Sequence, residues 1–164
     1  MATKDATLDT NIGLGVEQRG AIVRILNTLL SDEFLLYTKT RNFHWNVVGP
    51  HFHDLHKFME GQYEQLAGIA DSVAERARML GGRANGSMAE FLAESRLKEA
   101  PKRPLTAKEM IANLLDDHEA VIRNLRTDLV TVADTHGDAG TNDFLTGLME
   151  THEKMAWMLR ATLE

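Results

Sequence analysis

One stretch of the sequence places acidic and histidine side chains at helical spacing. The stripe consists of His56, Glu60, Glu64, Ala67, Asp71 and Glu75, at steps of three or four residues. Side chains with this spacing share one face of a helix. The pairs His56 with Glu60 and Asp71 with Glu75 can each converge on one ion. Imidazole with carboxylate suits iron, zinc or manganese, and we favour iron.

The two pairs are too far apart to hold the same ion within one chain. His56 and Asp71 are 15 residues apart, which on a straight helix is roughly 22 Å at 1.5 Å per residue. The simplest partner for each pair is the other pair of an antiparallel second copy, related by a two-fold axis near residues 64–68. Ala67 and Gly68 are small enough to let helices approach there. The spacing therefore predicts two identical sites shared between two chains.

His44 lies further upstream, in register with Leu30 and Tyr37 at spacings of seven residues, and is expected to supply another nitrogen. The alternative is that each acidic pair is an ordinary solvated helix face. In that case the protein would be a structural helical bundle whose metal-like stripe is only its polar surface. The spacing alone leaves both interpretations open.

Composition limits the class of fold and the chemistry. With 164 residues the chain fits one domain, and 43% hydrophobic content with only three prolines favours an all-α fold of long helices. The absence of cysteine excludes disulfides, zinc-thiolate sites and iron-sulfur clusters. Any metal must therefore be held by nitrogen and oxygen ligands.

Charge and hydropathy indicate the partners and the compartment. A net charge of -6 and a pI near 5.6 argue against a general polyanion binder and favour small cations. The sequence contains no apolar stretch of membrane-spanning length and no signal-peptide pattern. We expect no membrane association and a cytoplasmic location, with nucleoid association only if DNA is bound.

Hydrophobic periodicity predicts four long helices. Residues 1–15 are polar and are expected to form a flexible arm, and residues 16–164 form the domain. The first helix covers about 16–47, and Pro50 is expected to open the second, which ends at Gly81 and Gly82. A long connector over 83–105 contains a short helix near 87–93. This length allows a crossover between two helix pairs.

The second half of the chain repeats the helical pattern. Thr106 and Glu109 have the spacing of a capping box, and the third helix is expected to continue to Val132. A loop over 136–141 precedes the fourth helix, which is marked by apolar residues from Leu145 to Leu159. The expected architecture is a four-helix bundle with a long crossover that contains a short helix.

The run Asn-Phe-His-Trp-Asn-Val at 42–47, followed by Gly49, Phe52, Leu55 and His56, resembles the signature of the Dps family of miniferritins. The resemblance continues through 71–76 to Gly81 and Gly82, and the helix layout extends it over nearly the whole chain. It implies a ferritin-like bundle assembled as a hollow homododecamer. It also implies ferroxidase sites at the two-fold dimer interfaces.

The resemblance assigns roles residue by residue. His44, His56 and Glu60 of one chain, with Asp71 and Glu75 of the other, match the family's ligands for a two-iron site without haem. Much of the family has Asp at the position of Glu60, so the longer side chain here is a departure that bears on metal spacing and occupancy. Trp45 resembles the family's site-proximal aromatic residue, which intercepts stray oxidising equivalents; the alternative is a core tryptophan.

The resemblance also implies the reaction. Fe(II) is oxidised, preferably by hydrogen peroxide, and Fe(III) is stored as a mineral in the shell, which protects the cell against oxidative damage. The family admits iron through acidic pores near the last inter-helix connection, for which Asp134, Asp138 and Asp143 are candidates. These acids are alternatively helix-end and loop residues, and Asp143 suits a first helical turn.

Some relatives in this family bind and condense DNA through a basic tail, which is the alternative function for this chain. Its N-terminal arm is slightly acidic, so we expect no DNA binding. The remaining histidines receive no primary role. His51 and His53 are expected to be inert rather than an accessory metal site, His136 is a loop residue, and His118 and His152 are expected in the core or an interface, with His152 as an alternative ligand.

Overall fold

The computed structural model describes residues 10–164, and within this range every regular element is helical. The elements are α1 (Val16–Asn46), α2 (Phe52–Met79), α3 (Met88–Glu94), α4 (Ala107–Val130), a π-helical turn η1 (Thr131–Thr135) and α5 (Ala139–Leu163). The predicted all-α class and its four long helices are confirmed. The expected flexible arm falls mostly on residues 1–9, which lie outside the described residues.

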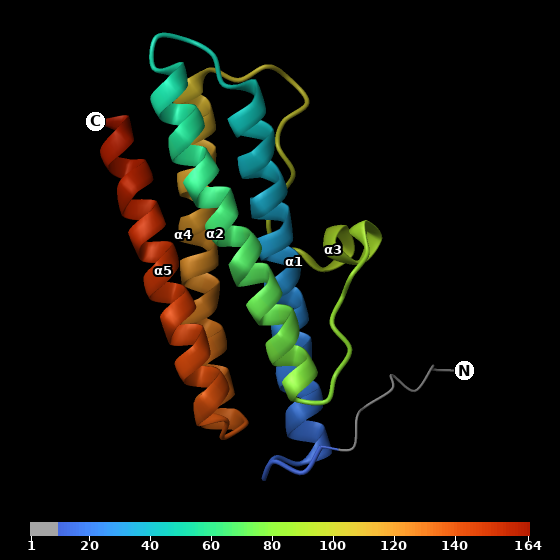
Figure 1. The fold of residues 1–164 in the computed structure, drawn as a ribbon. Coiled ribbons are helices and arrows are strands. Elements are labelled where there is room, and N and C mark those ends of the chain that lie inside the picture. The colour runs from blue at the N-terminus through green and yellow to red at the C-terminus, as the bar shows by residue number, and fades with distance from the viewer. Residues whose placement is uncertain (1–9) are drawn as a thin grey trace.

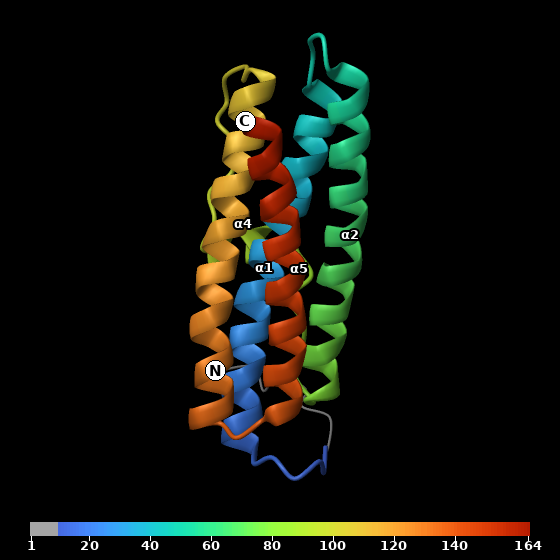
Figure 2. The same ribbon diagram turned by 90° about the vertical axis from the view of Figure 1, so that its left-hand side faces the viewer.

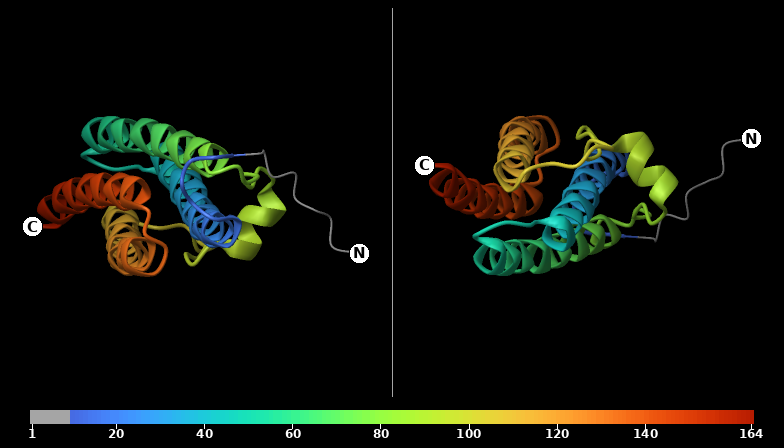
Figure 3. Two further views of the ribbon diagram at one scale, coloured as in Figure 1. Left: turned by 90° about the horizontal axis from the view of Figure 1, so that it is seen from below. Right: turned by 90° about the horizontal axis from the view of Figure 1, so that it is seen from above.

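The four long helices form two antiparallel pairs. Helices α1 and α2 lie side by side, as do α4 and α5, and the connector with α3 returns the chain to the other end of the bundle before α4 begins (Figure 1). The view turned by 90° shows the α4–α5 pair beside α1 and α2 (Figure 2). Seen end-on, the two pairs pack against each other, and α3 lies outside the bundle against α1 (Figure 3).

Local signals fix most helix ends. Thr106 and Glu109 form the predicted capping box, since Thr106 Oγ1 accepts from the Glu109 N–H and Glu109 accepts from the Thr106 N–H. Ser87 and Glu90 cap α3 in the same way. The prediction that Pro50 opens α2 is wrong. The helix begins at Phe52, because the Phe52 N–H first closes a turn onto the carbonyl of Gly49, whose φ is +123°.

The end of α4 differs from the sequence expectation. The third helix passes into the π-helical turn η1, and α5 begins at Ala139, earlier than the loop over 136–141 implied. The Asp138 N–H reaches the Val132 carbonyl across this turn at 3.2 Å. A π-helical turn has hydrogen bonds between residues five apart rather than four, and hydrophobic periodicity does not register this change.

Ionic contacts fasten the long crossover to the bundle. Asp32 on α1 is fully buried and accepts hydrogen bonds from Ser95 Oγ at 3.0 Å, and from Arg96 N at 2.6 Å and Arg96 Nε at 2.7 Å. Arg96 also donates to Asp128 on α4 at 2.9 Å. One arginine of the connector therefore ties α1 to α4.

The bundle interior is closely packed and apolar along most of its length. Its fully buried large side chains include Ile22, Leu26, Leu29, Leu36, Met59, Leu66, Ile111, Leu114, Leu125, Leu145 and Met155. At the end of α2, Gly81 has φ +85°, and a Cβ on Gly82 would lie 2.4 Å from Val23 Cγ1. Both glycines are therefore required where α2 stops against α1. No described helix has the length and apolarity needed to cross a membrane.

Candidate metal centre

The rings of His44 and His56 stack at one end of the bundle. His44 lies in the last turn of α1 and His56 near the start of α2, and the turn around Gly49 brings them together. Their centroids are 3.7 Å apart and their planes differ by 21°. His44 is buried and His56 is half-buried. The two histidines predicted from different helices thus lie side by side.

Each histidine fixes the proton position of the other. Nδ1 of His44 lies 2.8 Å from the carbonyl oxygen of His56, and Nδ1 of His56 lies 2.9 Å from the carbonyl oxygen of His44. A carbonyl oxygen can only accept, so each Nδ1 carries the proton and donates it. In the neutral ring each Nε2 then keeps its lone pair. Backbone carbonyls orient metal-binding histidines in the same way.

The carboxylate of Glu60 lies one helical turn after His56. Its Oε2 accepts a hydrogen bond from Lys57 Nζ at 2.5 Å. This bond lowers the pKa of Glu60; burial opposes the change, and the charges of Lys57, His44 and His56 add to it. Glu60 is therefore a carboxylate within electrostatic reach of both imidazoles. Sequence reasoning did not single out Lys57, although its spacing of three residues from Glu60 is the signal of a helical ion pair.

Aromatic rings surround the two histidines. The ring of Tyr63 meets the ring of His44 edge-on, with centroids 5.1 Å apart and planes at 74°. The ring of Phe52 lies 5.1 Å from that of His56. Tyr63 was also missed, but it follows His56 by seven residues on α2, and this spacing places both on one helix face.

Trp45 lies beside this site and is 62% exposed, so it is not a core residue. The guanidinium of Arg41 lies 5.2 Å from the centroid of the Trp45 ring, 5.0 Å from that of Tyr63 and 5.6 Å from that of Tyr37. Arg41 also donates a hydrogen bond to the Tyr37 hydroxyl at 2.6 Å. Arg41 thus joins Trp45 to the aromatic rings next to His44.

Asp71 and Glu75 lie on the same helix but far from the histidines. Because α2 is continuous from Phe52 to Met79, Asp71 is roughly 22 Å from His56 along the helix axis. Both acids are exposed. Within residues 10–164 no three His, Asp or Glu side chains of a single subunit are grouped to hold a metal ion. Within one subunit the predicted ligands therefore form two separate groups, which we call half-sites.

A mostly apolar groove of about 470 Å³ borders the acidic half-site. It lies between α1, α2 and the segment leading into α3, and its lining includes Leu30, Phe34, Tyr37, Ala67, Ala70, Asp71, Ala74 and Phe91. At its floor the rings of Phe34 and Phe91 stack with centroids 4.3 Å apart. An apolar groove beside an exposed carboxylate is the kind of surface that a further helix covers.

The three candidate pore acids differ in their surroundings. Asp134 and Asp143 are exposed, whereas Asp138 is buried. Asp138 caps α5, accepting from the N–H of Thr141 at 3.0 Å and from its hydroxyl, and it lies 3.4 Å from Arg76. Burial raises the pKa of Asp138, but the bonds from Thr141 and the charge of Arg76 outweigh it and lower the pKa. Its carboxylate is thus engaged within the subunit.

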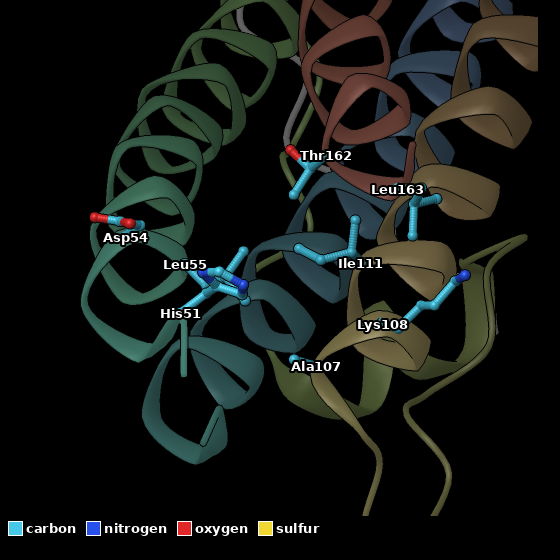
Figure 4. A pocket seen from close by; sticks show the side chains of 8 residues that line it. All are labelled: His51, Asp54, Leu55, Ala107, Lys108, Ile111, Thr162 and Leu163. Carbon is cyan, nitrogen blue, oxygen red and sulfur yellow. The ribbon is translucent and has the colours of Figure 1, made fainter. Parts of the chain in front are cut away.

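The remaining histidines lie outside this centre. His51 lines a cavity of about 480 Å³ whose walls are mainly Leu55, Ile111 and Leu163. In Figure 4 the carboxylate of Asp54 points away from these side chains, so the polar groups do not converge there. His53 is exposed. His118 and His152 are fully buried and hydrogen-bonded to each other at 2.9 Å, which confirms their expected place in the core.

Comparisons with known proteins agree with this architecture. Residues 23–164 match the family described as Ferritin-like domain. An uncharacterised low temperature-induced protein of Nostoc sp. is 50% identical over 154 residues, which cover 94% of this chain and 86% of that protein. DNA protection during starvation protein 2 of Bacillus anthracis is 37% identical over 142 residues, which cover 87% and 96% of the two chains.

A solved structure extends the agreement to three dimensions. The Dps protein of Vibrio cholerae O1, described as a member of a broad superfamily of ferritin-like diiron-carboxylate proteins, matches with a TM-score of 0.88 and 30% sequence identity. The match covers 96% of this chain and 98% of that chain. The bundle is thus ferritin-like, as its sequence pattern implied. The chain belongs to the Dps family of ferritin-like proteins.

Proposed function

We propose that this chain is a ferroxidase that oxidises Fe(II) at sites shared between two copies and stores Fe(III) as a mineral inside a dodecameric shell. The observation that carries the proposal is the stacked pair His44 and His56, whose Nε2 lone pairs are held ready by reciprocal Nδ1 bonds. The diiron-carboxylate superfamily of the Vibrio cholerae relative supports iron as the metal. Removing Fe(II) and peroxide together protects the cell against oxidative damage.

The surface of α2 supports a two-fold arrangement of copies. Ala67 and Gly68 are exposed near the midpoint between the half-sites, and a Cβ on Gly68 would have no atom within 4 Å. An antiparallel copy of α2 can therefore approach closely, and its ends bring Asp71 and Glu75 of the partner subunit to His44 and His56. The apolar groove beside Asp71 supplies further surface for the second copy.

Iron is the substrate, and the histidine and carboxylate side chains contribute differently to its binding. The imidazoles of His44 and His56 supply nitrogen, and the carboxylates of Glu60, with Asp71 and Glu75 of the partner subunit, balance part of the charge of two Fe(II) ions. Hydrogen peroxide takes one electron from each Fe(II) and two protons, which yields two Fe(III) and two waters. Because both electrons are transferred together, no hydroxyl radical is released. Trp45 is placed to donate an electron to a stray oxidant.

Glu60 is the ligand on which occupancy depends. Its carboxylate is already bound to Lys57, so a metal ion must displace this ion pair or share it. Competition of this kind weakens one iron position relative to the position held by the histidines. We propose that the second iron binds less tightly than the first.

Iron entry is assigned to acidic pores. Asp134 and Asp143 are exposed near the junction of η1 and α5, where rings of carboxylates from several subunits would concentrate cations by electrostatic focusing. Asp138 sits between them but is engaged by Thr141 and Arg76. We therefore propose a lesser role in iron entry for Asp138 than for its two neighbours.

DNA protection is the second candidate function, and the name of the Bacillus anthracis relative favours it. The net charge of -6 opposes direct DNA binding, so we propose that protection acts through iron and peroxide chemistry. A gel shift at low salt and neutral pH, without free iron, separates the two. Retarded DNA would establish direct binding instead.

The test of the proposed function is peroxide-driven oxidation of Fe(II) under anaerobic conditions. The double variant His44→Ala, His56→Ala is expected to oxidise Fe(II) at least tenfold more slowly while keeping its native mass near that of twelve chains. His53→Ala, which changes an exposed histidine on the same helix, is the matched control and should keep the normal rate. An unchanged rate in the double variant would refute the assignment. A native mass that shows no retained iron after iron loading would also refute the proposed function.

A further inference from the structure

A second group of metal-binding side chains lies inside the bundle of a single subunit. Glu33 on α1, His118 on α4 and His152 on α5 are each fully buried, and they come from three helices of the bundle that Figure 3 shows end-on. Nδ1 of His118 lies 2.9 Å from Nδ1 of His152, and Nε2 of His152 lies 2.9 Å from Oε1 of Glu33. The three side chains thus form a continuous row across three helices.

Most polar atoms of these three side chains have no hydrogen-bond partner among the described residues. Both carboxylate oxygens of Glu33 and the Nε2 atoms of His118 and His152 are buried and unpartnered. Within residues 10–164, the other buried side-chain atoms of this kind are Gln62 Oε1 and Arg41 Nε. Buried polar atoms are normally paired, so a concentration of unpartnered atoms indicates a bound group.

Asp32, the neighbour of Glu33, shows how this fold treats a carboxylate that is only structural. Asp32 is equally buried but accepts from Ser95 Oγ, Arg96 N and Arg96 Nε. Among the described residues Glu33 has no donor of this kind, and its ionic neighbour is the ring of His152. Buried charges are normally paired or coordinate a metal. The lack of donors at Glu33 therefore favours a bound cation.

The geometry between Glu33 and His152 also indicates a third participant. Nε2 and Oε1 are 2.9 Å apart, yet neither atom makes a hydrogen bond, because the oxygen lies off the direction in which the ring nitrogen points. Two ligand atoms that each lie about 2.0–2.2 Å from the same metal ion are roughly 3 Å from each other. The observed separation without alignment is therefore the arrangement of two ligands of one ion.

We propose that Glu33 and His152 bind a divalent first-row cation, of the class of Fe(II) or Zn(II), inside each subunit, and that His118 positions His152. In this arrangement Nδ1–H of His152 donates to Nδ1 of His118, and Nε2 of His152 turns its lone pair to the cation. The separation of 2.9 Å between the two Nδ1 atoms fits this hydrogen bond, and such a bond orients a metal-binding histidine.

The proposed protein ligands are two side chains, since residues 10–164 contain no group of three His, Asp or Glu placed to hold a metal ion. Gln62 extends the polar region, since its Nε2 lies 3.5 Å from the carbonyl of Met155, three residues after His152. The site is separate from the interface centre, because Glu33 precedes His44 by 11 residues on α1, roughly 16 Å along the axis.

The test uses the assembled double variant His44→Ala, His56→Ala, in which the interface centre is disabled, and Zn(II) as a redox-inert probe. Equilibrium dialysis followed by metal analysis is expected to retain one Zn(II) per chain. Adding Glu33→Gln should weaken this binding at least tenfold. Adding Glu150→Gln, an exposed acid on α5, is the matched control and should not change it. Zn(II) retention that is unaffected by Glu33→Gln would overturn the proposal.

His118 and a second measurement complete the test. His118→Phe should keep one Zn(II) per chain but weaken its binding about tenfold, as loss of an orienting partner does. X-ray absorption of Zn(II) in the background variant, with its core residues unchanged, should show one imidazole and a carboxylate. This X-ray absorption measurement does not depend on whether the core variants fold. A background variant that retains no Zn(II) would show that the cluster holds water only and would refute the site.

Discussion

Nδ1 of His44 donates to the carbonyl oxygen of His56, and Nδ1 of His56 donates to the carbonyl oxygen of His44, at 2.8 and 2.9 Å. Each ring thus links the end of one helix to the start of the next through its Nδ1. Because both acceptors are backbone atoms, replacing one ring leaves the acceptor of the other ring in place. The two side chains support each other directly only through the stacking of their rings.

Two nitrogen ligands in one proposed site predict strongly non-additive variants. His56→Ala removes one ligand and also the stacking partner of His44 at 3.7 Å, although the backbone carbonyl of residue 56 still accepts from His44 Nδ1. The single variant should therefore oxidise Fe(II) with peroxide nearly as slowly as the double variant, within about twofold, as expected for residues that act as a unit. Initial rates of all three variants check this. If the fold-reductions in rate of the two single variants multiply to give that of the double variant, the two histidines act independently.

A site shared between copies predicts complementation. One variant carries His44→Ala and His56→Ala, the other Asp71→Ala and Glu75→Ala, and each alone should be inactive. A mixed dimer has one site with all its ligands and one that keeps only Glu60. Random pairing of equal amounts should therefore restore about one quarter of the wild-type sites. Co-expression followed by anaerobic oxidation assays measures this, with each variant expressed alone as the control. Absence of recovery in verified mixed dimers would place all ligands in one chain.

Lys57→Ala tests the competition at Glu60. Without its ion pair the carboxylate should bind metal about two- to fivefold more tightly at neutral pH, the range for an exposed pair. The hydrogen bond from Lys57 is the main cause of the lowered pKa of Glu60, so its loss raises that pKa. Acid should then protonate Glu60 at a higher pH and weaken metal binding sooner. Co(II) titrations across pH measure both effects, and Lys57→Arg is the control that keeps the charge. Identical titrations in all three proteins would contradict the competition.

Arg96→Ala should destabilise the fold by about 3 kcal/mol, because it leaves the fully buried Asp32 without its charge partner. Urea unfolding at a fixed protein concentration measures the effect. Arg103→Ala breaks the exposed pair with Glu109, which solvent screens, and should cost far less than Arg96→Ala. Adding Asp32→Asn to Arg96→Ala should recover part of the loss. If Asp32→Asn instead adds its own loss of stability to that of Arg96→Ala, Arg96 stabilises the fold through an interaction other than its pair with Asp32.

Gly82→Ala should cost about 1–3 kcal/mol, since the new methyl group would lie 2.4 Å from Val23 Cγ1. Val23→Ala removes the obstructing atom, so the pair of changes should cost less than Gly82→Ala with Val23 intact. Gly147→Ala on α5 meets no atom within 4 Å, and in a helix interior it should be neutral or stabilising. Thermal unfolding distinguishes these variants. Equal effects of the two glycine changes would refute the steric cause.

The sequence predicted the features that depend on local rules. The capping box of Thr106 and Glu109 and the glycine stop at the end of α2 are read from neighbouring residues, and the structure confirms both. The placement of Asp71 and Glu75 on one helix with His56 follows from periodicity. The turn before α2 depends on Gly49 and its positive φ, so Pro50 alone misplaced the helix start.

Features that depend on packing between helices were not predictable. The exchange between His44 and His56 needs the register of α1 against α2, which periodicity does not specify. Glu33 was overlooked for a related reason. It follows Leu26 by seven residues and so falls on the buried stripe of α1, where a charged residue is itself the signal. Only the arrangement of α1, α4 and α5 reveals its neighbours.

The uninterrupted run of α2 has a consequence for how this sequence can diverge. One residue inserted between His56 and Asp71 would shift the acids by about 1.5 Å and rotate them by about 100° around the helix, away from the face they share with His56. Insertions and deletions should therefore be selected against throughout that span. The crossover between Gly82 and Thr106 is attached to the bundle at separate points, such as Arg96 and Phe91, and should vary far more in length among descendants of this gene.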